Sequence, residues 1–456
     1  MLYLVVYGSF IIFLVWINER NKKQTIEHFF VADRRVGGVF GGMSIAASWI
    51  WAPAIFVSTR VGYNWGYSAL VWFVIPNMLS LILFAPFANK VRQKIPEGFT
   101  YIEYIKDKDG GFRTTQLWVQ ISMQVVIFAL QLTAGAKLLS FVSGVDYGLI
   151  VIIMALIALA YSLWSGLNSS IFTDWIQYII ILIAIAVIYF GLPYDQINFS
   201  FERLRFEPFK WNMLMEFGFG SAIGLLFAIF ADHQQWQRAF SIKKDRIVRT
   251  YITGGLLHGV VTFSLGTLGV FIFMSGFKTS NVAIVGADFI NSNMPILFSI
   301  VFVFMALCGL CSTLDSGLCA FGSLFSNEFE KLKNRNKINV SRFFMVCLSI
   351  AGVIVAFCNL GIITLWFIAS TIRLSAFAPT IMSIWSQKYR GIVGTISIIV
   401  GLLVGGPIFF YGINSQVHEF KTLGMALSIG VSAFVSVGYM LYKVLKPGGR
   451  VAHEAN

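Results

Sequence analysis

Long apolar segments recur along almost the whole chain of 456 residues. The hydrocarbon core of a bilayer needs about 20 apolar residues per helix, and thirteen segments approach or exceed that length. They are residues 2–18, 38–60, 67–89, 114–143, 147–166, 168–192, 213–231, 248–276, 293–326, 343–358, 360–387, 392–411 and 422–442. Apolar residues make up 57% of the chain and charged residues only 12%, which one soluble core cannot hide. The sequence therefore predicts an all-α polytopic membrane protein, and it excludes soluble, disordered and nucleic-acid-binding classes.

The basic residues between these spans indicate an orientation. The net charge of +13 sits in short clusters, and most Lys and Arg residues fall in alternate connections. Basic connections stay on the cytoplasmic side, so we expect the N-terminus outside and the C-terminus in the cytoplasm. Short loops fit a multi-pass protein of the plasma membrane, and a bacterial inner membrane is the expected location.

The second span carries a proline well inside its length. Pro53 has no N–H and its ring displaces the carbonyl four residues back, at Trp49. Interruptions at membrane depth mark cavities, because lipid cannot satisfy a free carbonyl. The sequence predicts a broken helix with a cation ligand at the break, and a simple proline kink is the alternative.

A second interruption is predicted in 213–231, where Gly218, Gly220 and Gly224 surround Ser221. It follows the first by five spans, and two sets of five with broken leading helices are typical of inverted-repeat transporters that bind substrate near the midplane. We expect a 5+5 core with broken first and sixth core helices. The predicted divisions are 1–37 (extra helix and cytoplasmic linker), 38–192 (first repeat), 193–212 (extracellular loop), 213–391 (second repeat) and 392–456 (two helices and a basic tail).

The span 293–326 contains adjacent hydroxyls at Ser312 and Thr313, with the Gly309 carbonyl one turn earlier. Together with the carbonyls of Ala46 and Trp49 they supply five mostly neutral oxygens. This set suits a hard monovalent cation and does not suit a proton, because none of the five groups titrates near neutral pH. The alternative is that the two hydroxyls bond their own helix or pack between helices.

Asp174 and Asp315 both lie inside predicted spans. Intramembrane acids are costly and usually functional. Either could neutralise a cation, or pair structurally with Lys137 or Arg373, the two basic residues within spans.

Asp232 ends the second interrupted helix, and we expect residues 233–238 to form an amphipathic helix at the inner surface. No catalytic set is apparent, since the chain has no His-Glu-x-x-His, Gly-x-Ser-x-Gly or nucleotide-binding motif. The sequence therefore predicts that the protein is not an enzyme.

Four stretches together resemble the sodium:solute symporter family, which shares the inverted-repeat architecture of the leucine transporter. The Ser-Trp-x-Trp-Ala run within 46–53 is especially similar to the urea-transporter branch. The other stretches are 165–177, with Thr-Asp-Trp-Ile-Gln, 232–238, with Gln-Arg, and 312–316, with Ser-Thr-Leu-Asp-Ser. The resemblance extends from about residue 29 to 391.

The resemblance implies a sodium ion as cofactor, bound between the first and eighth core helices. The implied ligands are the carbonyls of Ala46, Trp49 and Gly309 and the hydroxyls of Ser312 and Thr313. In some members a second sodium site or exit path uses the fifth-helix aspartate and eighth-helix hydroxyls. Here that implies Asp174 with Thr313 and Ser316, and Asp315 beside them.

By analogy the substrate pocket lies between the two breaks. Its expected lining is Ser48, Trp49, Trp51, Gln124, Gln131, Phe227, Phe230, Thr371 and Arg373. Residues 50–53 are apolar where sugar carriers of the family have polar residues, which argues against a sugar. If Arg373 faces the pocket, a carboxylate substrate is favoured. If it pairs with an acid, a neutral solute such as urea is favoured.

We therefore expect a sodium-coupled secondary active symporter that imports a small polar solute, such as urea or an amino acid like proline, by alternating access. Its expected partners are that solute and the lipid bilayer, with no nucleic acid. A proton-coupled carrier using Asp174 or Asp315 is one alternative, and an uncoupled transporter, channel or sensor on the same fold is another. The sequence leaves the solute, the number of sodium ions and the oligomeric state open.

Overall fold

The computed structural model describes residues 2–196, 206–328 and 334–445. Within these ranges the chain is helical and has no β-strand, only an isolated bridge between Val36 and Ile242. Eleven helices in these ranges are long and apolar enough to cross a membrane, and a bent pair brings the number to twelve. The count of thirteen stays a prediction, because the expected span 213–231 is built from shorter pieces. Part of the expected loop 193–212 and the basic tail after 445 lie outside the described residues.

The helices follow the chain in a simple order. The first half comprises α1 (Leu2–Glu19), α2 (Ile26–Val31), α3 (Gly38–Trp49), α4 (Ser58–Trp65), α5 (Tyr67–Lys94), α6 (Tyr101–Tyr104), α7 (Phe112–Ser143), α8 (Tyr147–Ser165) and α9 (Leu167–Phe190). The second half comprises α10 (Trp211–Met213), α11 (Phe219–Leu226), α12 (His233–Ser241), α13 (Ile247–Met274), α14 (Val285–Asn293), α15 (Ile296–Glu328), α16 (Asn334–Phe357), α17 (Ile362–Trp385), α18 (Gly391–Asn414) and α19 (His418–Leu445).

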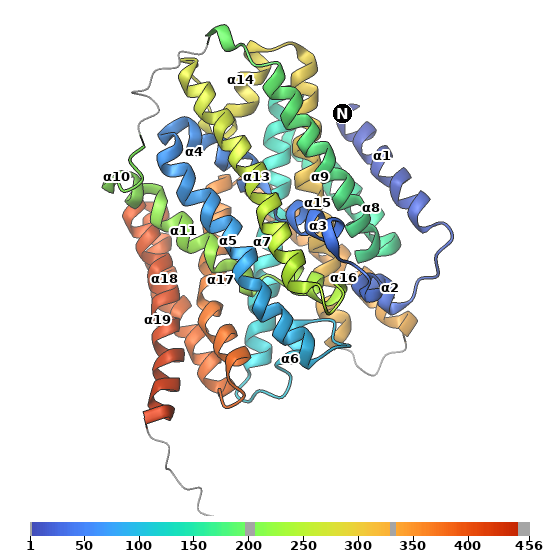
Figure 1. Cartoon of the computed structure of the whole chain (residues 1–456), viewed down its shortest axis with the longest axis vertical. Coiled ribbons are helices and arrows are strands. Elements are labelled where there is room, and N and C mark those ends of the chain that lie inside the picture. The colour runs from blue at the N-terminus through green and yellow to red at the C-terminus, as the bar shows by residue number, and fades with distance from the viewer. Residues whose placement is uncertain (1, 197–205, 329–333, 446–456) are drawn as a thin grey trace, which may run out of the picture.

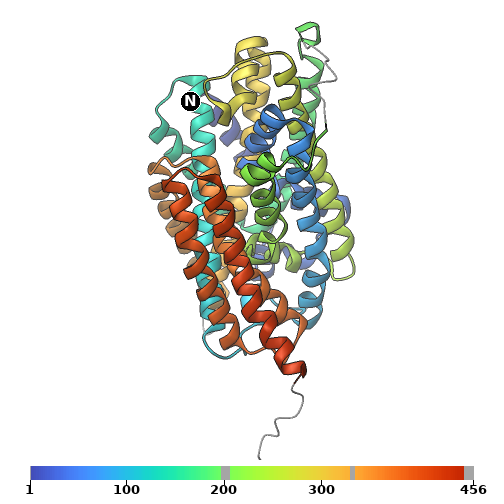
Figure 2. The same cartoon turned by 90° about the vertical axis from the view of Figure 1, so that its left-hand side faces the viewer.

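The long helices form one elongated bundle (Figures 1 and 2). The first turn of α1 and the last turn of α19 lie at opposite ends of it. Helices α18 and α19 pair along one edge and pack on α17, whereas α1 lies against α8 and α9. Helix α15 contacts α3, α7, α9 and α12, so its polar residues meet both broken segments.

The first predicted break is present. Helix α3 ends at Trp49, and a π-helical turn, Pro53–Val57, leads into α4 after a bend of 80°. Pro53 begins this second part, where its missing N–H costs little. The backbone between Trp49 and Pro53 is thereby released from the regular helix.

The second break differs from the expectation. The glycine cluster lies within a π-helical turn (Leu214–Gly218) and α11, and the interruption follows it, in a short 3₁₀ segment, Ala228–Ala231. Glycine can permit a break in a helix, but Gly224 lies at a contact between helices instead. A Cβ on Gly224 would lie 2.9 Å from the Met425 side chain. The turn at Asp232, which caps α12 by accepting from the Gln234 N–H, marks the actual break.

Helix α12 corrects a second expectation. It does not lie on the inner surface, because every one of its residues is buried. Its polar side chains bond to protein instead of water: Gln237 Nε2 donates to the Phe30 carbonyl at 2.9 Å. An amphipathic pattern has the same appearance whether the polar face meets water or a polar interior.

Two glycines allow helices to approach each other closely at the centre of the bundle. A Cβ on Gly62 would lie 1.9 Å from the Gly266 carbonyl oxygen, so α4 and α13 cross backbone to backbone. A Cβ on Gly309 would lie 2.8 Å from the Ile50 carbonyl oxygen. The second contact brings α15 directly onto the first break.

Candidate ion and solute sites

The Thr313 side chain connects α15 to the first break. Its Oγ1 lies 3.3 Å from the Ser48 carbonyl oxygen and 3.2 Å from the Gly309 carbonyl oxygen. The Ala46 carbonyl accepts from the Ile50 N–H at 2.9 Å. The structure thus brings Gly309 and Thr313 to the end of α3, with the Ser48 carbonyl as a neighbour that the sequence analysis did not name.

Ser312 points to a different partner. Its hydroxyl donates to Asp174 Oδ1 on α9 at 2.6 Å. The predicted sodium ligands therefore divide, with Thr313 at the break and Ser312 at the buried acid. Trp49 ends α3, where its indole Nε1 donates to Asn77 Oδ1 at 2.7 Å.

Asp174 is paired with an arginine that the sequence analysis placed at the surface. Arg238 Nη2, from α12, donates to Asp174 Oδ2 at 2.8 Å, and both side chains are buried. The Ser44 hydroxyl donates to the same oxygen at 2.6 Å. A buried carboxylate needs such charge-assisted partners, and here α3, α9 and α12 supply them.

Asp315 and Ser316 lie beside this pair. Asp315 Oδ1 accepts from Ser170 at 2.9 Å and from Ser316 at 3.1 Å. Its Oδ2 is buried and has no hydrogen-bond partner among the described residues. The expected salt-bridge partners are elsewhere, since Lys137 donates to the Leu360 carbonyl at 3.2 Å and Arg373 faces Asp232.

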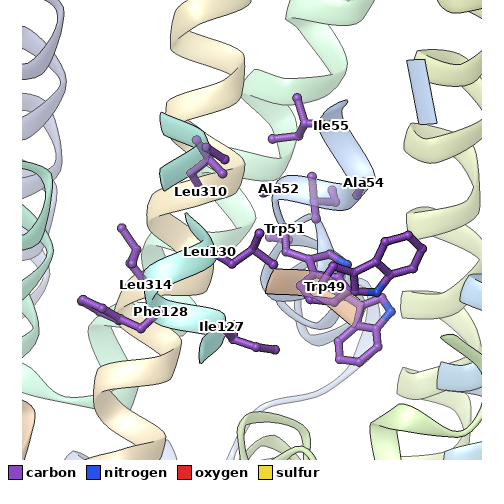
Figure 3. Packing of buried hydrophobic residues seen from close by; sticks show 14 of the residues in the cluster. Trp49, Trp51, Ala52, Ala54, Ile55, Ile127, Phe128, Leu130, Leu310 and Leu314 are labelled. Carbon is purple, nitrogen blue, oxygen red and sulfur yellow. The ribbon is translucent and has the colours of Figure 1, made fainter. Parts of the chain in front are cut away.

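A small cavity lies between the two breaks. Its volume is about 10 Å³, which is room for roughly one water molecule. It is lined by Ser48, Trp49, Trp51, Ile127, Asp232, Gln234, Thr313 and Arg373. Figure 3 shows the Trp49 and Trp51 indoles close together at the break, with Ile127 of α7 nearby.

Arg373 faces this cavity and pairs loosely with an acid. Its Nη1 lies 3.8 Å from Asp232 Oδ2, and its guanidinium stacks 5.1 Å from the centre of the Trp51 ring. Neither Nη atom has a hydrogen-bond partner among the described residues, and neither does Trp51 Nε1. Three buried donors without a hydrogen-bond partner among the described residues therefore belong to two residues that line the cavity.

The other predicted pocket residues lie outside this lining. Gln124 bonds Gln234 at 3.1 Å, and Gln131 Oε1 accepts from the Ala52 N–H at 2.8 Å. Phe227 and Phe230 both pack on Phe377, with ring centres 4.5 and 5.2 Å away, and the Thr371 hydroxyl donates to the Phe367 carbonyl at 2.9 Å. The resemblance to the family had implied Ser48, Trp49, Trp51 and Arg373 for this lining but not Ile127, Asp232, Gln234 or Thr313. An acid that ends an apolar span and precedes a polar run was the available signal for Asp232.

A larger cavity of about 280 Å³ lies toward α4, with Arg60, Trp65, Phe217 and Phe367 among its lining residues. An aromatic layer separates it from the small cavity. The Trp366 ring packs edge-on against Trp51, at 6.4 Å, and also contacts Phe217 and Phe367. Trp366 thus stands between residues that line the two cavities.

Comparison with known proteins gives the family. The sodium:solute symporter family matches residues 29–401. This chain belongs to the sodium:solute symporter family. The chain is 22% identical to the probable urea active transporter 3 of Schizosaccharomyces pombe over 423 residues, which cover 81% of the chain and 63% of that protein. It is 23% identical to the urea-proton symporter DUR3 of Oryza sativa subsp. japonica over 299 residues, covering 57% of the chain and 42% of that protein.

The chain thus spans about half the length of the curated relatives it matches. Among solved structures, a Na⁺-coupled sialic acid symporter in a substrate-bound outward-open state superposes with a TM-score of 0.76 at 16% identity, covering 96% of each chain. This likeness establishes the fold, and a substrate cannot be inferred from it.

Proposed function

We propose that this protein is a sodium-coupled symporter that imports a small neutral solute by alternating access across the plasma membrane. One observation carries the proposal: Thr313 and Ser48 line the small cavity, and the Thr313 hydroxyl also lies between the carbonyls of Ser48 and Gly309. An ion bound to these oxygens would set the position of the cavity wall. Differential ion affinity between two conformations is the physical basis of coupling.

The charges at the cavity favour a neutral solute. Asp232 and Arg373 balance each other, so a carboxylate substrate would add an uncompensated buried charge. The unpartnered donors of Arg373 and Trp51 suit a carbonyl oxygen, and Asp232 suits an N–H donor. Urea combines both groups, and it appears in the names of the relatives above, so we propose it as the first candidate.

The two cavities fit an occluded stage of transport. The central cavity is too small for a solute in this conformation, and the larger cavity lies beyond Trp366. We infer that residues 38–192 and 213–391 act as the two repeats that rearrange around the site, with the N-terminus outside and the C-terminus cytoplasmic. Solute binding then requires Trp366 to move away from Trp51.

The test is uptake of radiolabelled urea into proteoliposomes under a sodium gradient, with choline as the replacement ion. Sodium-driven accumulation is expected, and a double substitution, Ser312→Ala with Thr313→Ala, should abolish it without loss of folding. Ser326→Ala is the matched control, because Ser326 lies on the same helix and donates to the Gly322 carbonyl one turn earlier. Sodium dependence that survives the double substitution would refute the ion site.

If urea is not transported, thermal stabilisation by a panel of small neutral amides, with sodium and then with choline, identifies the solute. A ligand that stabilises the protein only in sodium supports coupled binding. Equal stabilisation in choline contradicts sodium coupling.

Proton coupling is the second candidate. The rice relative is named a urea-proton symporter, and Asp174, Asp232 and Asp315 are all buried here. In that case uptake would follow a pH gradient in the complete absence of sodium.

A further inference from the structure

The position expected for a second sodium ion contains a protein cation. The resemblance to the family assigned that position to Asp174, Thr313 and Ser316, with Asp315 beside them. In the structure one nitrogen, Arg238 Nη2, lies 2.8 Å from Asp174 Oδ2 and 2.6 Å from Ser316 Oγ. Arg238 Nε also lies 3.4 Å from the Ser44 hydroxyl. The guanidinium therefore takes two of the oxygens predicted for a second ion, Asp174 Oδ2 and Ser316 Oγ.

The contacts of Arg238 span separate parts of the fold. Arg238 belongs to α12, beyond the second break, whereas Asp174 is on α9 and Ser316 on α15. All three side chains are at most 1% exposed. A guanidinium presents several donors in fixed directions and keeps its charge under all ordinary conditions, so it is a permanent occupant of this position while α12 stays in place.

The charges of the cluster formed by Asp174, Asp315 and Arg238 indicate how many mobile cations it accepts. Asp174 and Asp315 contribute two carboxylates, and Arg238 contributes one positive charge. With both acids ionised, one monovalent cation completes the balance, and the buried Asp315 Oδ2, which has no hydrogen-bond partner among the described residues, is an available ligand for it. A second added cation would leave an uncompensated positive charge in a dry interior.

Ser312 links this cluster to the proposed sodium site. Its hydroxyl donates to Asp174 Oδ1 at 2.6 Å, and its neighbour Thr313 lies at the first break. A sodium ion at Ser312 and Thr313 would therefore bind next to the uncompensated charge.

We propose that Arg238 is a built-in cation that replaces a second sodium ion, so that one sodium ion accompanies each solute. This inference rests on the proposed sodium-coupled function. It adds the number of ions and the residue that fixes that number.

Equilibrium binding of radioactive sodium to the purified full-length protein tests the proposal. Wild type should bind one equivalent per chain, and the Hill coefficient for sodium in uptake should be about one. Arg238→Gln removes the charge and frees the oxygens of Asp174 and Ser316, so it should bind two equivalents. Arg238→Lys keeps the charge and should bind one. Arg342→Gln is the control, because Arg342 bonds the Leu163 carbonyl on another part of the fold, and it should also bind one.

A double substitution, Asp174→Asn with Arg238→Gln, covers the case in which Arg238→Gln alone does not fold. It replaces the ion pair by two neutral amides and leaves Asp315 as the only acid of the cluster, so it should bind one equivalent. Two equivalents in wild type or in the folded double variant overturn the proposal, as does a single equivalent in folded Arg238→Gln. No sodium binding by wild type would instead refute sodium coupling itself, so the two failures are distinguishable.

Discussion

At the scale of single residues, buried polar side chains hold the broken backbone in place. Gln131 is fully buried on α7, and its Oε1 accepts the Ala52 N–H at 2.8 Å, one residue before Pro53. That N–H has left the regular helix and belongs to a fully buried residue. A buried donor without a partner costs about 1–3 kcal/mol, so one side chain helps to maintain the shape of the site.

We expect Gln131→Leu to lower the free energy of unfolding by about 1–2 kcal/mol, because the Ala52 N–H loses its acceptor. The melting temperature in detergent and the apparent solute affinity should both fall. Gln120→Leu is the matched control on the same helix, since its side-chain amide is buried with no hydrogen-bond partner among the described residues. Equal destabilisation by both substitutions would contradict a specific role for Gln131.

A second residue-scale prediction concerns Arg373 and its acid. Arg373→Leu should leave Asp232 buried without its cation, and Asp232→Leu should do the reverse, so each should reduce solute affinity at least tenfold. The double substitution should fold better than either single one, because no unpaired charge remains. Solute-dependent shifts in melting temperature measure both effects, and a double variant that still binds solute normally would exclude the pair from the site.

At the scale of elements, a short helix joins the N-terminal helix to the core. Helix α2 carries His28, whose side chain bonds Glu19 at 2.8 Å and Asp33 at 2.9 Å. Lys22 lies 3.6 Å from the same Glu19. The hydrogen bond to Glu19 raises the pKa of His28, desolvation opposes this, and Asp33 adds to the increase. His28 in its charged form thus ties α1 to the segment that precedes α3.

The contact between His28 and Glu19 predicts how the stability of the protein changes with pH. A histidine whose pKa is raised by folding contributes stability that is complete below its unfolded pKa of about 6.5, and that is lost as pH rises through the higher folded pKa. The melting temperature should therefore fall as pH increases above about 6.5. His28→Gln should flatten this part of the profile. An unchanged pH slope in His28→Gln would assign the effect to another group.

At the scale of the whole molecule, the two ends of the site differ. The end near α4 has the cavity of about 280 Å³, and we propose that the path at the opposite end, near α2 and α6 (Figure 1), is held shut by hydrogen bonds between segments far apart in the chain. Arg34 contributes to this closure by donating to the carbonyls of Glu97, at 2.8 Å, and Gly98, at 2.9 Å. The Val36 backbone adds a bridge to the residues after α12. Under the proposed transport function, these bonds would have to break before a solute could leave toward that end.

Arg34→Ala should shift the population toward the conformation open at the α2 end. Cys319 is 1% exposed and its carbonyl contacts Gln237 of α12, so its thiol should react faster with a small maleimide when α12 moves. The experiment uses a background with Cys347→Ser and Cys358→Ser, and mass spectrometry locates the label. Unchanged labelling of Cys319 in Arg34→Ala would contradict the assignment of this closure.

The sequence by itself determined the membrane class, the all-helical fold and the first broken helix. These properties depend on local physics: apolar runs must lie in lipid, and Pro53 cannot continue a helix. The resemblance to the family grouped Ser48, Trp49, Trp51 and Arg373, and the structure places all four in the lining of one small cavity. Ser312 and Thr313 were selected for their adjacent hydroxyls, and their role as sodium ligands stays a prediction.

Only the tertiary structure decided which buried charged residues pair with one another. Arg238 and Asp232 appeared to belong to a surface helix, since an amphipathic pattern does not reveal whether its polar face meets water or other polar groups. The second break lies after the glycines and not at them, because helix packing rather than backbone freedom accounts for Gly224. Asp174 pairs with Arg238 and Asp232 with Arg373. Which charges meet depends on distances between helices that are far apart in the chain, and local sequence does not contain that information.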